Sequence, residues 1–120
     1  MIQGRKMAYN IERKNDVIYI AIEDRLEIEE SEILENEINQ RIDQGDLYLV
    51  INFAHATYLS SLFLRALIRL IEKLNTEKGI LVLSSLSDNI KRIFSIMEID
   101  KLFVIKKTDE ESFLYINETV

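Results

Sequence analysis

The residues that could support chemistry are a serine pair, Ser60 and Ser61, and the only histidine of the chain, His55. A serine and a histidine can act as nucleophile and base when their side chains meet. Neither serine lies in the Gly-x-Ser-x-Gly turn that exposes the nucleophile of α/β hydrolases, and the chain has no cysteine as an alternative nucleophile. We therefore expect no enzyme, and we keep a small serine hydrolase that uses Ser60 or Ser61 with His55 as a remote alternative.

The same serines are well placed to begin a helix. Ser60 is a suitable N-cap, because its hydroxyl can accept a hydrogen bond from an unpaired backbone N–H of the first turn. Ser61 would then lie in the first turn, where the positive end of the helix dipole favours an anion. A phosphate on Ser61 would add a charge of roughly −2 at this point. The pattern predicts Ser61, and secondarily Ser60, as a phosphorylation site, although two ordinary capping serines would look the same.

Two apolar segments must position these serines. Residues 47–53 read LYLVINF, which is typical of a strand buried on both faces. Residues 61–74 are apolar almost all round and predict a mostly buried helix. On a helical wheel Ser61, Arg65 and Arg69 share an arc that includes Leu62, whereas Phe63 falls on the inward-facing side. We expect Leu62 to be exposed and Phe63 to lie in the core.

The rest of the chain alternates strands and helices. Segments 7–13 and 17–22 predict a β-hairpin, and an apolar stripe over 29–43, followed by Gly45, predicts a helix. A strand is expected at 80–83, a helix from Ser87 and Asp88, a strand at 102–105, and a closing helix from Asp109 to about Tyr115. The order ββαβαβαβα indicates an α/β fold with a mixed β-sheet flanked by helices. Residues 1–120 should form a single domain, with 1–6 as a loose N-terminal segment.

Composition excludes several classes of function. The net charge of −6 disfavours nucleic acid as a partner, and no apolar run reaches the ~18 residues of a membrane span. The absence of cysteine suits a reducing compartment, so we expect a cytoplasmic protein. Nucleotide-binding glycine loops and metal-ligand motifs are also missing, and no cofactor or metal is expected.

The segment Tyr58-Leu59-Ser60-Ser61-Leu62-Phe63-Leu64-Arg65, after the apolar strand 49–53, resembles the STAS domains of anti-sigma factor antagonists. Their usual pattern is aromatic-aliphatic-(Asp/Ser)-Ser-(Ser/Ala)-Gly-Leu at the start of a helix, and Ser61 matches its phosphorylated serine. Residues 90–94 and 102–105 are similar to the family's penultimate helix and last strand. This chain departs from the pattern by having Ser60 where an acid is common, Leu62 for a small residue and Phe63 for the glycine.

The resemblance implies a regulator that binds an anti-sigma factor/serine kinase and releases it when Ser61 is phosphorylated, with a phosphatase that resets the cycle. The implied partner interface comprises Thr57, Tyr58, Ser60, Ser61, Leu62, Arg65 and Arg69. The alternative reading is a constitutive, non-phosphorylated STAS scaffold or a transporter-accessory subunit, which the loss of acid and glycine favours. The sequence assigns no oligomeric state.

Overall fold

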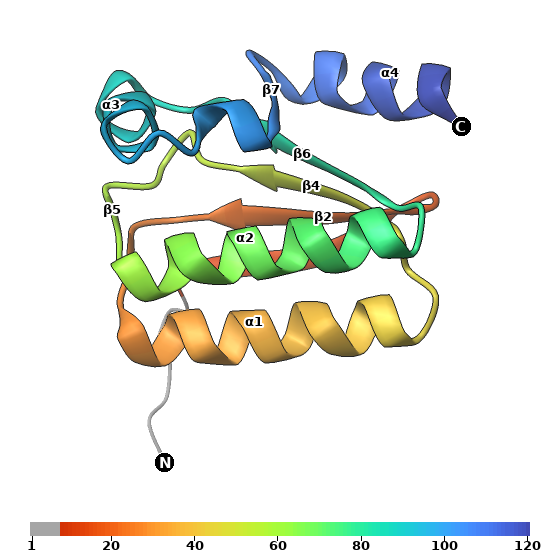
Figure 1. Ribbon diagram of the computed structural model, residues 1–120, viewed down its shortest axis with the longest axis horizontal. Helices are drawn as coiled ribbons and strands as arrows, with labels where there is room; N and C mark the ends of the chain where they lie inside the picture. The colour runs from red at the N-terminus through yellow and green to blue at the C-terminus, as the bar shows by residue number, and fades with distance from the viewer. Residues whose placement is uncertain (1–7) are drawn as a thin grey trace.

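The computed structural model describes residues 8–120, and a five-stranded mixed sheet forms its centre (Figure 1). The strands lie in the order β1-β2-β4-β6-β7. The hairpin of β1 and β2 is antiparallel, and every later neighbour pairs in parallel. This confirms the predicted α/β fold. The bounds of the strands are β1 (Tyr9–Lys14), β2 (Val17–Ile22), β4 (Tyr48–Asn52), β6 (Ile80–Ser84) and β7 (Val104–Lys106).

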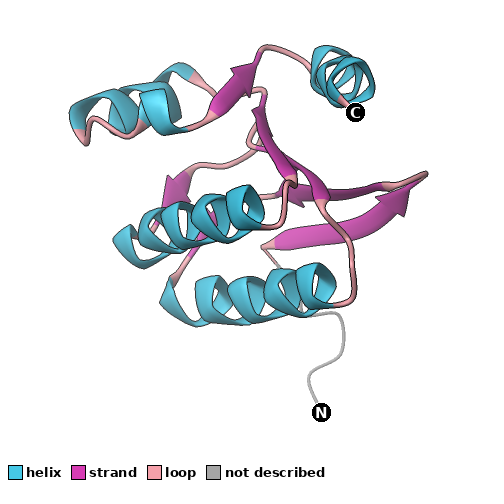
Figure 2. Ribbon diagram, turned by 45° about the vertical axis from the view of Figure 1, so that its right-hand side comes forward, coloured by secondary structure: helices cyan, strands magenta, loops and turns pink. Residues whose placement is uncertain are grey.

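Helices cover both faces of this sheet, as Figure 2 shows. On one face lie α1 (Ile28–Asp43), α2 (Ser61–Thr76) and α3 (Asp88–Ile96), followed by the short 3-10 helix η1 (Asp100–Leu102). On the other face lies α4 (Asp109–Thr119). None of the described helices is both long and apolar enough to span a membrane.

The central strand β4 contributes to both cores, which confirms the prediction from its continuous apolar run. Leu49 and Ile51 belong to the larger core under α1, α2 and α3. Val50, which points the opposite way, belongs to the smaller core under α4. Alternation of side chains along the strand therefore requires apolar residues at successive positions.

The structure adds two short strands that were not predicted from the sequence. β3 (Arg25–Leu26) and β5 (Tyr58–Leu59) pair in parallel as a separate two-stranded sheet. Strands of two residues carry no readable period, so hydrophobic patterning could not reveal them. The predicted last strand was also placed too early, because Leu102 ends η1, and the closing helix continues beyond Tyr115 to Thr119. The expectation for residues 1–6 lies outside the described residues.

Two glycines shape the connections between helices and strands. Gly45 follows the C-cap of α1 with φ of +101°, a conformation that glycine adopts without strain, and this confirms that it ends the helix. Gly79 lies between α2 and β6, where a Cβ would be 2.6 Å from the carbonyl oxygen of Leu47 and 2.7 Å from Cδ2 of Leu74. Position 79 therefore requires glycine, because a side chain would collide with Leu47 and Leu74.

Candidate functional site

The segment that leads into α2 is fixed by a second segment, which precedes α1. Besides the β3–β5 pairing, the backbone N–H of Thr57 donates to the carbonyl of Asp24 over 3.1 Å. The Thr57 hydroxyl donates to the Asp24 carboxylate over 2.8 Å. Further on, the N–H of Ser60 donates to the carbonyl of Leu26 over 3.2 Å. The connector before Ser61, the candidate phosphorylation site, is therefore an ordered part of the molecule.

Ser60 is the N-cap of α2, as predicted, and it is buried. Its side chain is directed inward at 3 % exposure, and its Oγ accepts from the N–H of Phe63 over 3.2 Å. The Oγ atoms of Ser60 and Ser31 are 3.0 Å apart. The interface and modification role expected for Ser60 needs correction, because this side chain lies inside the protein between α1 and α2.

Ser61 is the first residue of α2 and is exposed. Phe63 faces inward as the helical wheel predicts, because its side chain is fully buried in the larger core. Leu62 is only half-buried, so the expectation of an exposed leucine is met in part. The bulky Phe63 thus occupies the interior, and Ser61 remains open to solvent at the positive end of the helix dipole.

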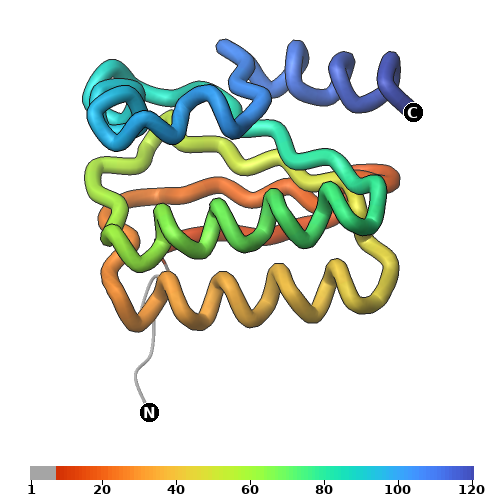
Figure 3. The backbone as a smooth tube through the Cα atoms, in the orientation of Figure 1, coloured from red at the N-terminus to blue at the C-terminus, as the bar shows by residue number. Residues whose placement is uncertain are grey.

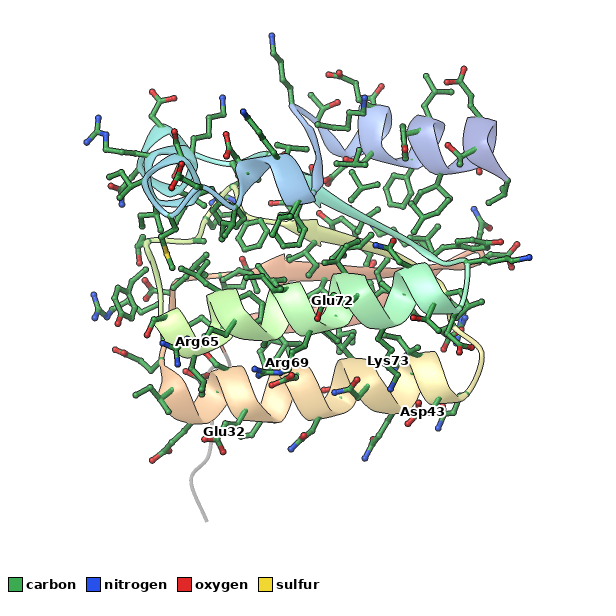
Figure 4. The ribbon with its side chains drawn as sticks, in the orientation of Figure 1. Glu32, Asp43, Arg65, Arg69, Glu72 and Lys73 are labelled. Carbon is green, nitrogen blue, oxygen red and sulfur yellow. The ribbon has the colours of Figure 1, made fainter. Side chains whose placement is uncertain are left out.

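Arg65 and Arg69 extend from the exposed stripe of α2 (Figure 4), and their contacts differ. Arg69 donates two hydrogen bonds to the carboxylate of Glu35 on α1, each over 2.9 Å, and this bidentate pair raises the pKa of the guanidinium. Arg65 is exposed and forms no ion pair with any of residues 8–120. Arg69 therefore braces α2 against α1, and Arg65 is the cation of this stripe that is available to a partner.

Sequence reasoning missed Arg25, which joins the predicted interface through Tyr58. The Arg25 guanidinium lies over the Tyr58 ring, 4.4 Å from its centroid, and its Nε donates to the Glu27 carboxylate over 3.0 Å. Both Arg25 and Tyr58 are at the surface. No sequence signal indicated this contact, because it depends on the β3–β5 pairing of two strands too short to show a period.

His55 lies exposed in the loop after β4. The hydroxyl of Ser60 is engaged with Ser31 and with the start of α2, so it is not oriented as a nucleophile toward this histidine. Among residues 8–120, no hydrogen bond joins His55 to Ser61. The geometry therefore provides no nucleophile–base pair for the hydrolase alternative.

A second polar cluster fixes the start of α4 at the carboxyl ends of the central strands. The Asp109 carboxylate accepts hydrogen bonds from Tyr19 over 2.6 Å, Asn52 over 2.8 Å and Ser84 over 2.7 Å. Burial alone would raise the pKa of Asp109, but the three hydrogen bonds together lower it below its usual value. No group of three or more potential metal ligands occurs in the described part of the chain. This cluster is a structural anchor for α4.

Comparison with known proteins identifies the family of this chain. The model of the STAS domain matches residues 8–112. The chain belongs to the STAS domain family. Among curated protein sequences, none matches this STAS domain.

Solved structures share the fold at low sequence identity. An anti-sigma factor antagonist from Mycobacterium paratuberculosis is 20% identical, with a TM-score of 0.80 over 91% of this chain and 92% of the other. The Bacillus cell fate determinant SpoIIAA in its phosphorylated form is 18% identical, with a TM-score of 0.75 over 91% and 99%. A sulfate transporter family protein from Wolinella succinogenes is 12% identical, with a TM-score of 0.75 over 88% of each chain. These likenesses establish the STAS fold and no more.

Proposed function

We propose that this STAS domain is a regulatory protein-binding domain, which binds an anti-sigma factor/serine kinase through the start of α2 and is released when Ser61 is phosphorylated. The observation that carries the proposal is the exposed position of Ser61 as the first residue of a helix whose preceding connector is hydrogen-bonded in place. The solved phosphorylated form of a protein with this fold supports it. A phosphatase that removes the phosphate would reset the cycle in the cytoplasm.

The surface around Ser61 suits recognition of a protein. Three residues close to Ser61 in the sequence contribute to this surface: Tyr58, the half-buried Leu62 and the exposed Arg65. The β3–β5 pairing adds Arg25, whose guanidinium lies over the Tyr58 ring. Aromatic and arginine side chains on ordered backbone are the residue types that contribute most to protein interfaces. The proposed interface is therefore Thr57, Tyr58, Ser61, Leu62 and Arg65, with Arg25 added. Arg69, which was expected to contact the partner, is paired with Glu35 and supports this surface from α1.

Phosphorylation would act on this surface through charge and size. A phosphate in the first turn is stabilised by the helix dipole, so the fold tolerates it. A partner that packs against a neutral serine would meet roughly two negative charges, and a mismatch of this kind at an interface costs a few kcal/mol. The modification would thus release the partner without unfolding the domain.

The test is to incubate the purified chain with ATP and the serine kinase that copurifies with it from the source cell, and to locate phosphate by mass spectrometry. We expect a single phosphate on Ser61, and none on the Ser61→Ala variant. Because Ser60 is buried, it should stay unmodified even when Ser61 is replaced. Phosphate found only at other positions would contradict the proposal.

A second candidate is the constitutive STAS scaffold or transporter-accessory subunit, which binds its partner without a phosphorylation cycle. It is favoured by Ser60 and Phe63, which replace the acid and the glycine of the usual motif, and by the transporter protein among the structures of this fold. The same mass spectrum separates the two candidates, since a scaffold would carry no phosphate while still capturing its partner.

A further inference from the structure

Ser31 holds the start of α2 from a neighbouring helix. It is a buried residue of α1, 1 % exposed, and its Oγ lies 3.0 Å from the Oγ of the N-cap Ser60. The first turns of α1 and α2 lie at the same end of the molecule (Figure 3). Residues that are far apart in the sequence, 31 and 60, thus meet directly beneath the exposed Ser61.

The direction of this hydrogen bond follows from the other bonds of the two hydroxyls. Ser31 Oγ donates its only proton to the carbonyl of Glu27 over 2.7 Å, so toward Ser60 it can only accept. Ser60 must therefore donate its proton to Ser31, which leaves its lone pairs free for the N–H of Phe63. The order of donation is Phe63 N–H to Ser60, Ser60 to Ser31, and Ser31 to Glu27.

Ser60 is held on its backbone as well. Its N–H donates to the carbonyl of Leu26, just before α1, so one short segment binds both the main chain and the side chain of the N-cap residue. Without the acceptor at Ser31, the Ser60 proton would stay unpaired in the interior, or the Ser60 side chain would turn away. In the second case α2 would lose its side-chain cap, and the Phe63 N–H would keep only the Ser60 carbonyl, at 3.0 Å. Either outcome loosens the turn that presents Ser61.

We infer that Ser31 is the positioning residue of the candidate switch: through the Ser60 hydroxyl it fixes the first turn of α2 and with it the orientation of Ser61. This deepens, and rests on, the proposed function at Ser61. Because Ser31 is buried, it would touch neither a partner nor a phosphate donor. Its contribution is to keep the modified residue in one geometry before the modifying enzyme binds.

The chain offers a closely matched control in Ser112. Ser112 occupies the same position in α4 as Ser31 does in α1, four residues after the N-cap, and it is equally buried. Its Oγ donates to the carbonyl of its own N-cap residue, Thr108, over 2.9 Å. It differs in making no side-chain bond to another helix among the described residues. Ser112→Ala therefore reproduces the local loss of Ser31→Ala without the contact to α2.

The first experiment is native-state hydrogen exchange followed by NMR on the full chain, which requires no partner. Ser31→Ala should speed exchange of the Phe63 amide by about five- to tenfold relative to amides in the middle of α2. Ser112→Ala should leave the Phe63 amide unchanged, and Ser31→Thr, which retains the hydroxyl, should restore most of its protection. Equal effects of Ser31→Ala and Ser112→Ala on Phe63 would overturn the inference.

The second experiment measures phosphorylation of Ser61 by the copurifying serine kinase. Ser31→Ala should reduce kcat/KM about tenfold, with Ser112→Ala near the wild type, because a loosened first turn presents the hydroxyl in many orientations. Unaltered kcat/KM in Ser31→Ala would overturn the positioning role. If the wild type is not phosphorylated at all, the proposed function fails, while hydrogen exchange at Phe63 still decides whether Ser31 fixes the turn.

Discussion

At the scale of single residues, Phe63 stands where the usual STAS motif has glycine, and its side chain packs into the interior. The ring is fully buried and joins a core that contains the edge-to-face pairs of Phe53 with Phe94 and Phe94 with Phe103. The helical wheel predicted this inward position from sequence. It could not predict the burial of Ser60, because the acceptor Ser31 lies 29 residues earlier in the chain, on α1.

We predict that Phe63→Asp unfolds the domain or destabilises it by more than about 4 kcal/mol, since it places a carboxylate in an apolar core and removes a large side chain. Phe63→Leu, which keeps the site apolar, should cost clearly less. Urea denaturation followed by circular dichroism measures both. A Phe63→Asp variant as stable as Phe63→Leu would show that this position is not part of the core.

Asp109 should make the domain sensitive to acid. Its pKa is lower in the folded protein than the usual value near 3.9, so its stabilising effect is complete above that value and is lost as the pH falls through the folded pKa. Asp109→Asn should therefore be less stable than the wild type at neutral pH, and the difference should shrink at acidic pH. The exposed neighbour Glu110 serves as control through Glu110→Gln. A stability difference for Asp109→Asn that is independent of pH would contradict this assignment.

At the scale of elements, α1 and α2 form one unit that presents the site. Ion pairs join them along their length, from Arg69 with Glu35 to Lys73 with Asp43 at 2.8 Å, and the β3–β5 pairing joins the connectors before both helices. The periodicity of each helix was readable from the sequence. Their mutual contacts were not, because the wheel of one helix contains no information on its neighbour, and Arg69 was therefore predicted as a partner contact alone.

Substitution of the two arginines of α2 should have different effects, on folding stability for Arg69 and on partner binding for Arg65. Arg69→Ala removes a largely exposed ion pair and should lower the free energy of unfolding by less than about 1 kcal/mol. Arg65→Ala breaks no ion pair among residues 8–120 and should leave stability unchanged while weakening capture of the partner several-fold. Thermal unfolding and quantitative pull-down from source-cell lysate measure the two effects. Loss of stability in Arg65→Ala with normal capture would reverse these assignments.

The connection from α2 to β6 should tolerate no side chain at Gly79. An added methyl group would lie within 3 Å of both the Leu47 backbone and the Leu74 side chain, so Gly79→Ala should destabilise the fold by roughly 1–3 kcal/mol. Glu77→Ala, at an exposed position of the same connection, is the control and should be nearly neutral. Equal midpoints of urea unfolding for the two variants would show that the connection yields without cost.

At the scale of the whole molecule, hydrophobic patterning was sufficient for the layered fold. The apolar runs of β4 and β6 and the stripes of α1 and α2 determined which segments lie in the sheet and which cover it. What patterning left out depends on contacts between distant residues: the β3–β5 pairing, the Ser31–Ser60 hydrogen bond and the Asp109 cluster. Ser61 could be predicted from the sequence motif. The hydrogen bonds that fix the turn around it could not, because they join residues far apart in the chain.

The surface around Ser61 is proposed to bind a partner and to release it when it gains negative charge. Calorimetry of the purified chain with the serine kinase captured from the source cell tests this most directly, comparing the wild type with Ser61→Asp and using Ser61→Ala as the uncharged control. We predict that Ser61→Asp weakens binding by a few kcal/mol, that Ser61→Ala binds nearly as the wild type does, and that circular dichroism shows all three folded. If Ser61→Asp binds the kinase as tightly as the wild type does, negative charge at Ser61 does not release the partner.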